Sequence, residues 1–274
     1  MHSEIFRKSD ELLNAIKAVK VDPEEEKKLL ATLFSCIDHT SLNGTDTEQH
    51  IIQFCNDAIN MSLSDGGHVA AVCVYPVFVD IAKKCLHNTG IRVAAVTGGF
   101  PHGQMPQSIK IDEVRHAVSM GADEIDFVIN RGYVLGGERN RVAEEVAAAK
   151  EACGGKLLKV IIESGELKDM EMIYDTSMLV LGAGADFVKT STGKIPVGAT
   201  PEAALSMICA LSDFSKNHQR QVGFKAAGGI STPYDALFYM QIMKKYANVN
   251  FVNNQIFRVG TSRLTTSLYK ILTQ

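Results

Sequence analysis

Short apolar runs alternate with longer amphipathic stretches along most of this chain. Eight of the runs are continuous and rich in Val, Ile, Phe and Ala. Strands of a parallel sheet that is covered on both faces have this composition. The pattern therefore predicts eight buried strands, at Leu33–Ile37, Val69–Val74, Arg92–Thr97, Glu124–Ile129, Leu157–Ile162, Asp186–Thr190, Val222–Ala226 and Ile256–Val259.

The stretches between these runs carry helical signals. Apolar residues recur at helical spacing, Ala and Glu accumulate, and two Thr-Pro pairs are typical of a helix cap followed by its first turn. We predict helices at Thr47–Met61, at Ser108–Val118 with Ser108 as the cap, at Glu138–Cys153, and after Thr200 and Thr232. Two more are expected before the first strand, at about Ser3–Val19 and Pro23–Thr32.

Regular alternation of strands and helices indicates a parallel sheet with right-handed crossovers. Eight such units favour a closed (β/α)₈ barrel, a TIM barrel of the α/β class. A doubly wound open sheet is the alternative, but it would carry a glycine-rich nucleotide-binding turn after an early strand, and none is present. We expect an N-terminal helical extension at residues 1–32 that packs on the barrel at 33–274, the two forming one structural domain.

Composition narrows the possible partners. The 274 residues are 46% hydrophobic and 22% charged, with a formal net charge of -3, so nothing favours nucleic acid or an anionic membrane. The six cysteines form no CxxC pair, which fits a reducing compartment. Residues 1–20 are too charged for a signal peptide. We predict a soluble cytoplasmic protein.

Three lysines and an aspartate are embedded in the predicted apolar strands: Asp126, Lys159, Lys189 and Lys225. Each alone could be half of a structural ion pair. In a barrel, however, all four would converge on one axis near the C-terminal ends of the strands, where active sites lie. Burial and a neighbouring cation lower the pKa of a lysine, and a neutral lysine attacks carbonyl carbon. The set therefore suggests Schiff-base chemistry with a carboxylate to move protons.

A second candidate feature is an anion site at three turns. Gly193-Lys194 follows the sixth strand, Gly228-Gly229 follows the seventh, and Gly260-Thr261-Ser262-Arg263 follows the eighth. Glycines allow backbone N–H groups to approach an anion closely, although they could merely turn the chain. Loops after the seventh and eighth strands commonly bind phosphate in such barrels. We find no motif of metal-ligand spacing and expect no metal or other cofactor.

From Asp38 to Ser262 the chain resembles the deoxyribose-phosphate aldolases, class I aldolases of (β/α)₈ fold. The most specific motif is "ADFVKTSTGK", and "LLKVIIESGEL", "GFKAAGG", "GADEIDFV" and "FPHG" support it by their order and spacing. The resemblance implies reversible, metal-independent cleavage of 2-deoxy-D-ribose 5-phosphate to D-glyceraldehyde 3-phosphate and acetaldehyde. It also implies a homodimer whose ligands are small phosphorylated sugars and aldehydes.

The same resemblance implies a role for each candidate residue. Lys189 would form the Schiff base, Lys225 would lower its pKa, Asp126 would transfer protons and Lys159 would complete the relay. The residues expected near the sugar are Asp38, Thr40, Cys73 and Thr192, and those expected at the phosphate are Gly193, Lys194, Gly228, Gly229, Ser262 and Arg263.

Two positions depart from the family pattern. Ala226 stands where proline is common, and Arg263 stands where a second serine is common. The terminal tyrosine of some family members is also not found at the end of this sequence, Gln274. These differences motivate an alternative hypothesis, an aldolase-like protein of weak activity that serves as a binding or scaffold protein. A metal-dependent aldolase is a third hypothesis, which EDTA sensitivity would distinguish.

Overall fold

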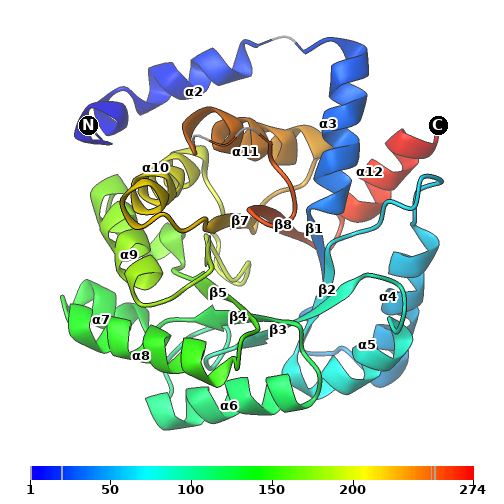
Figure 1. The fold of residues 1–274 in the computed structure, drawn as a ribbon, viewed down its shortest axis with the longest axis horizontal. Helices are drawn as coiled ribbons and strands as arrows, with labels where there is room; N and C mark the ends of the chain where they lie inside the picture. Colours follow the sequence, from blue (N-terminus) through cyan, green and yellow to red (C-terminus); the bar gives the residue numbers. More distant parts are fainter. Residues whose placement is uncertain (1, 20, 248, 250) are drawn as a thin grey trace.

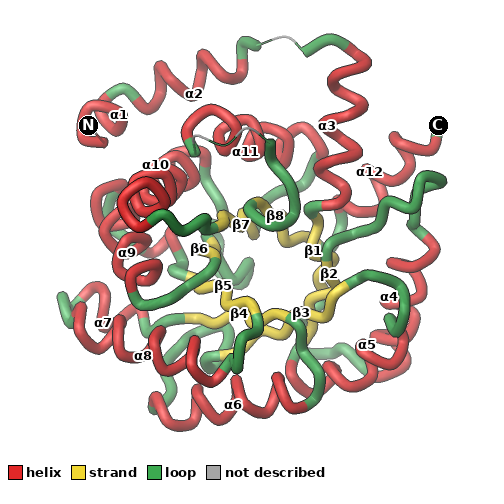
Figure 2. Tube along the Cα trace, in the orientation of Figure 1, coloured by secondary structure: helices red, strands yellow, loops and turns green. Residues whose placement is uncertain are grey.

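Eight parallel strands close into a barrel in the order of the sequence (Figure 2). The computed structural model describes residues 2–19, 21–247, 249 and 251–274. The closed barrel confirms the predicted (β/α)₈ fold, and the open doubly wound sheet is wrong. The strands are β1 (Ile37–Thr40), β2 (Ala71–Val74), β3 (Arg92–Thr97), β4 (Glu124–Val128), β5 (Leu157–Ile161), β6 (Phe187–Lys189), β7 (Gly223–Ala227) and β8 (Phe257–Thr261).

Helices form a ring outside the barrel (Figure 1). Those that follow the strands are α4 (Glu48–Asn60), α5 (Val79–Cys85), α6 (Gln107–Ser119), α7 (Arg131–Leu135), α8 (Arg139–Ala152), α9 (Met170–Gly182), α10 (Pro201–His218), α11 (Pro233–Tyr246) and α12 (Leu264–Thr273). Two short 3₁₀ helices, η1 (Pro76–Phe78) and η2 (Ser164–Glu166), follow β2 and β5. None of the helices in the described part of the chain is long and apolar enough to cross a membrane.

Three helices precede β1: α1 (His2–Arg7), α2 (Ser9–Lys17) and α3 (Pro23–Ser35). Of these, α2 packs against α10 and α11, and α3 packs against α11 and α12 (Figure 1). Leu13, Ile16 and Leu30 are buried in the same hydrophobic cluster as the barrel strands. The extension therefore shares its hydrophobic core with the barrel. The boundary predicted between the two, at residue 32, stays a prediction. Met1 and Lys20 of the extension lie outside the described residues.

Three predicted elements are wrong in their bounds. The helix predicted at about Ser3–Val19 is two helices, α1 and α2, separated at Lys8. The helix that begins at Pro23 continues to Ser35, so the start of the predicted first strand is helical and β1 begins at Ile37. A short apolar run cannot be distinguished from the buried face of a helix by periodicity alone. Ser108 lies inside the first turn of α6, because Pro106 occupies the cap position. The Thr caps of α10 and α11 are confirmed, each accepting a backbone hydrogen bond.

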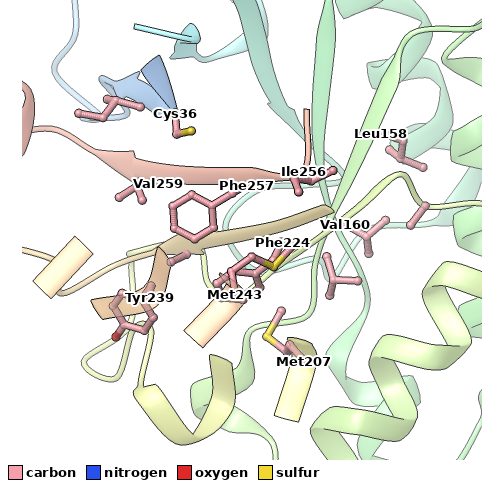
Figure 3. Packing of buried hydrophobic residues seen from close by; sticks show 14 of the residues in the cluster. Cys36, Leu158, Val160, Met207, Phe224, Tyr239, Met243, Ile256, Phe257 and Val259 are labelled. Atoms are coloured by element: carbon pink, nitrogen blue, oxygen red, sulfur yellow. The ribbon is translucent and has the colours of Figure 1, made fainter. Parts of the chain in front are cut away.

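Side chains alternate between the two faces of the barrel wall. Leu158, Val160, Phe224 and Phe257 point outward and pack with buried residues of the helices, among them Met207 of α10 and Met243 of α11 (Figure 3). The residues between them in sequence point inward. Since the strand repeat is two, every second position of each apolar run faces the axis.

The inward face has two chemically different halves. On the side of β2 and β3 it is small and apolar, with Ala71, Cys73, Ala94 and Val96 in one cluster. The remaining strands place buried charged side chains on the axis, described below. The wall of helices excludes water from this charged half, which sets its electrostatics.

Candidate active site

Asp126 of β4 is the centre of a buried ionic cluster. Its Oδ1 accepts a hydrogen bond from Lys159 Nζ at 2.9 Å, and its Oδ2 accepts from Lys189 Nζ and from Lys225 Nζ, both at 2.7 Å. The carboxylate is fully buried, as are Lys159 and Lys225, whereas Lys189 keeps 2% of its surface exposed. The structure thus brings together all four charged strand residues singled out in the sequence.

Strand register explains this convergence. Asp126 is paired with Lys159 across β4 and β5, and Lys189 is paired with Lys225 across β6 and β7. Partners in parallel strands point to the same face, so both pairs reach the axis. Two lysines side by side in a dry interior are stable only when a carboxylate lies between them.

The three lysines respond differently to this environment. Burial lowers the pKa of Lys189 and the nearby Lys225 lowers it further, while Asp126 acts in the opposite direction. Lys225 is also desolvated, but Asp126 and Asp38 together raise its pKa. Burial works against the charge of Lys159 too, and the surrounding carboxylates outweigh it and raise its pKa. Lys189 is therefore the amine of the cluster that loses its proton most easily.

Glu124 and Arg258 belong to the same cluster, and the sequence analysis missed both. Arg258 Nη2 donates to Glu124 Oε1 at 2.8 Å, and its Nη1 donates to Asp38 Oδ1 at 2.6 Å. Glu124 also pairs with Lys159 at 2.5 Å. The sequence pattern could have identified both residues. Glu124 lies two residues before Asp126 and so on the same face of the strand, and Arg258 interrupts an apolar run.

A count of the buried charges shows why one amine is left over. Four cations (Lys159, Lys189, Lys225 and Arg258) share three carboxylates (Asp38, Glu124 and Asp126). Arg92 adds a fifth cation at Glu124, but 39% of its side chain is exposed and water screens it. Loss of one proton makes the buried set neutral. Since Lys189 is the lysine of the cluster with the lowered pKa, it is the cation that loses this proton.

A cavity of about 470 Å³ lies at the C-terminal ends of the strands, and Lys189 forms part of its wall. Its other walls come from the ends of β1, β7 and β8, from the turns after β1, β6, β7 and β8, and from His50 and Phe54 of α4. Thr40 and Thr192, both expected near a sugar, line it as well. Lys189 is the one cluster cation among the described residues that reaches this cavity, so a ligand bound there meets this amine and not the others.

The predicted anion-binding turns form one continuous edge of the cavity. Gly193, Lys194, Gly228, Gly229, Ser262 and Arg263 all line it. Gly193 and Gly228 have φ angles of +74° and +82°, which favour glycine, and a Cβ on Gly228 would lie 3.2 Å from the Gly193 Cα. The two turns therefore touch each other backbone to backbone, and side chains at these positions would separate them.

Charged side chains border this edge. Lys194 Nζ donates to the Leu42 carbonyl at 2.5 Å, which joins the turn after β6 to the turn after β1. Arg263 precedes α12, and its side chain is exposed at the cavity. The first N–H groups of a helix attract anions. The cavity thus has the Lys189 amine at one position and turns that carry Lys194 and Arg263 at another.

Asp38 and Cys73, also expected near a sugar, lie below the cavity wall. Asp38 is fully buried, bonded to Lys225 and Arg258, and these cations hold its pKa well below the ordinary range. Cys73 belongs to the apolar half of the interior, and burial raises the pKa of its thiol to about 11. Neither residue is among the described residues that line the cavity. In this structure they act instead as neighbours of Lys189 and Lys225.

Comparison with known proteins agrees with this geometry. Residues 32–244 match the model of the family described as DeoC/LacD family aldolase. Among solved structures, the chain is 28% identical to a protein from Coccidioides immitis provisionally named a deoxyribose-phosphate aldolase, with 96% of this chain and 97% of that chain covered and a TM-score of 0.73. It is 27% identical to QR15, an aldolase, over 87% of this chain and 96% of that chain, with a TM-score of 0.71.

A deoxyribose phosphate aldolase from Aeropyrum pernix, described as a tetramer, shares the fold at 24% identity, 93% and 99% coverage and a TM-score of 0.69. The family match spans most of the chain and includes all four axial residues of the ionic cluster around Asp126. By this match and by the buried lysine cluster of its barrel, the chain belongs to the DeoC/LacD family of aldolases.

Proposed function

We propose that this chain is a class I aldolase that reversibly cleaves 2-deoxy-D-ribose 5-phosphate to D-glyceraldehyde 3-phosphate and acetaldehyde. One observation carries the proposal: the amine with the lowered pKa, Lys189, is also the cluster lysine at the cavity wall. A neutral amine at that position attacks an aldehyde carbon. The cationic turns at the other edge of the same cavity suit the phosphate of the same substrate.

The reaction follows from these positions. Lys189 Nζ adds to the C1 aldehyde, water leaves, and a protonated Schiff base forms. The C3 hydroxyl gives up its proton, the C2–C3 bond breaks, and its electron pair enters the iminium to give an enamine. Glyceraldehyde 3-phosphate leaves. Protonation of the enamine at C2 and hydrolysis then release acetaldehyde and the free amine. Asp126, 2.7 Å from Lys189 Nζ, is the proton acceptor and donor, directly or through water.

Lys225 and Lys159 support this chemistry by their charge. Both stay protonated because the carboxylates raise their pKa values, so both keep Asp126 ionised. The pKa of Asp126 lies well below the ordinary range for the same reason. Lys225 also lowers the pKa of Lys189. We assign Lys225 as the neighbour that lowers the pKa of Lys189, and Lys159 as the partner of Asp126 in proton transfer.

Borohydride trapping tests the proposal. Acetaldehyde and sodium borohydride should leave a two-carbon adduct on Lys189, located by peptide mass spectrometry, and Lys189→Ala should give no adduct and no turnover. The described residues include no group of three or more His, Cys, Asp and Glu side chains that could hold a metal. We expect EDTA to leave turnover of 2-deoxyribose 5-phosphate unchanged. A folded protein without an adduct would refute the aldolase proposal and favour a scaffold role.

Two further assignments are part of this proposal. The six cysteines are unpaired, which supports a reducing compartment such as the cytoplasm. We propose a homodimer as the assembly, by likeness to the aldolases that the sequence resembles. Light scattering coupled to size exclusion tests this directly, and a tetramer or monomer would refute it.

A further inference from the structure

A single buried carboxylate, Glu163, connects three strand ends below the cavity. It follows β5 and accepts hydrogen bonds from Thr192 after β6 and from Arg131 after β4. Its side chain is fully buried, yet it is not among the described residues that line the cavity. Burying an ionised carboxylate costs free energy unless hydrogen bonds and an opposite charge compensate it.

The backbone shows how Glu163 reaches this position. Ile162 N donates to the Lys189 carbonyl at 3.1 Å, and Ser164 N donates to the carbonyl of the next residue, Thr190, at 2.8 Å. The β5 side thus uses two residues where β6 uses one, which is a bulge. Glu163 is the extra residue, and its φ of +52° is left-handed, a conformation that residues with side chains rarely adopt. The bulge turns its carboxylate toward the turn after β6.

Both carboxylate oxygens act on Thr192. Oε1 accepts from the Thr192 backbone N–H at 3.0 Å, and Oε2 accepts from the Thr192 hydroxyl at 2.5 Å. With its proton directed at Glu163, the Thr192 hydroxyl oxygen accepts from Lys194 N at 3.1 Å. This chain of bonds determines the shape of the Thr192–Lys194 turn, including Gly193 and its positive φ angle.

Arg131 anchors the carboxylate from the opposite side. Its Nη1 donates to Glu163 Oε2 at 3.0 Å, while its Nε pairs with Glu166 at 2.9 Å. The two acids differ sharply in setting, since Glu163 is buried and 39% of the Glu166 side chain is exposed. Water screens the exposed pair, and of the two acids it is Glu163 that accepts the hydrogen bonds from Thr192.

We propose that Glu163, held by Arg131, is a positioning residue that aligns the Thr192–Lys194 turn for phosphate without touching substrate itself. The role of phosphate as the anion rests on the proposed function. The turn begins only three residues after Lys189. Glu163 therefore sets where an anion sits relative to the amine, while the amine keeps its own partner, Asp126.

The test compares Glu163→Gln with Glu166→Gln, which removes the exposed acid from the same arginine. Gln keeps the size of the side chain, but its NH₂ group cannot accept a hydrogen bond. At least one of the three groups that donate to Glu163, from Thr192 and Arg131, then loses its acceptor. Glu163→Gln should weaken the binding of inorganic phosphate, measured by calorimetry, at least tenfold. It should raise KM for 2-deoxyribose 5-phosphate by a similar factor and change kcat/KM for unphosphorylated 2-deoxyribose less than threefold. Glu166→Gln should change each value less than twofold.

Arg131→Met provides a second variant should Glu163→Gln lose its native circular dichroism spectrum. It removes the anchor and keeps the carboxylate, and the same tenfold loss of phosphate affinity is expected. Equal losses for phosphorylated and unphosphorylated substrates, or unchanged phosphate affinity in both variants, would overturn the positioning role. So would an unmodified protein that binds no phosphate. Borohydride trapping separates the two proposals, because an adduct at Lys189 supports the aldolase whatever Glu163 does.

Discussion

Replacing Lys225 by methionine tests the charge balance that underlies the proposed chemistry. Methionine approximates the length of the lysine stem but removes its charge. Asp38 keeps Arg258 at 2.6 Å and Lys159 at 3.6 Å, so it remains compensated and the barrel should fold. The variant leaves three buried cations for three carboxylates. We expect Lys189 to hold its proton as the third cation.

The structure sets the size of this effect. The Nζ atoms of Lys189 and Lys225 are at most about 5.4 Å apart, because each lies 2.7 Å from the same Asp126 oxygen. Two unit charges at this separation repel each other by about 3 kcal/mol at an effective dielectric constant of 20. That energy corresponds to about 2 pKa units. At a pH below both values, the neutral fraction of Lys189 should fall about 100-fold in Lys225→Met.

The assay is kcat/KM for 2-deoxyribose 5-phosphate as a function of pH, with glyceraldehyde 3-phosphate detected by a coupled NADH reaction. The acid limb of this profile reports the pKa of the free enzyme's nucleophile. We expect the limb to move up by about 2 pH units in Lys225→Met. Lys225→Arg keeps the charge and should keep the wild-type midpoint, even if its bulk lowers the rate. A Lys225→Met profile with an unshifted midpoint would refute the electrostatic argument.

Three further predictions concern other parts of the fold. His39 is buried, bonded to Thr265 and stacked on Phe54, and burial lowers its pKa to about 4. Between pH 6.5 and 4 the unfolded chain binds a proton at this histidine and the native protein does not, so the free energy of unfolding falls as pH falls, by about 3 kcal/mol at pH 4. Urea unfolding as a function of pH should show this loss. A His39→Gln protein with the same dependence of stability on acid pH would refute it. Lys110 and Glu145 form a buried ion pair at 2.5 Å, so Lys110→Met should cost about 3–5 kcal/mol of unfolding free energy, and a melting temperature within 1 °C of the unmodified protein would contradict this. Arg263→Ser should weaken phosphate binding about three- to tenfold, less at high salt, and an equal or tighter affinity would show that Arg263 makes no contact with the anion.

Periodicity alone was enough to place the catalytic candidates on one face. Lys159, Lys189 and Lys225 each interrupt a short apolar run, and a strand repeat of two directs such a residue either to the helices or to the axis. Lys159 and Lys225 have apolar neighbours on both sides and Lys189 has Val188 before it, and these neighbours suit the helix-facing positions. The charged residue then faces inward. The same local reasoning found the caps of α10 and α11, because a Thr-Pro pair acts within one turn.

Local patterns could not assign the partners of these residues. Glu124 and Arg258 lie 134 positions apart and meet only because the barrel closes β8 beside β1 and encloses both on its axis. The role of Glu163 depends on a one-residue mismatch between β5 and β6, which no single strand reveals. The boundary between α3 and β1 was missed for a related reason, since its apolar residues serve a helix face as well as they would serve a strand.

The sequence by itself thus determined the alternation of strands and helices, the barrel that follows from it and four of the charged residues on the axis, Asp126, Lys159, Lys189 and Lys225. The resemblance named Lys189 as the Schiff-base lysine, but only the tertiary structure shows how Lys189 differs physically from the other two lysines. Lys189 and Lys225 occupy paired positions on neighbouring strands, and the difference between them lies in what surrounds them. Lys225 contacts two carboxylates in a closed interior, while Lys189 contacts one and opens onto the cavity. A pKa depends on distances to all nearby charges and on exclusion of water, and both are properties of the folded chain.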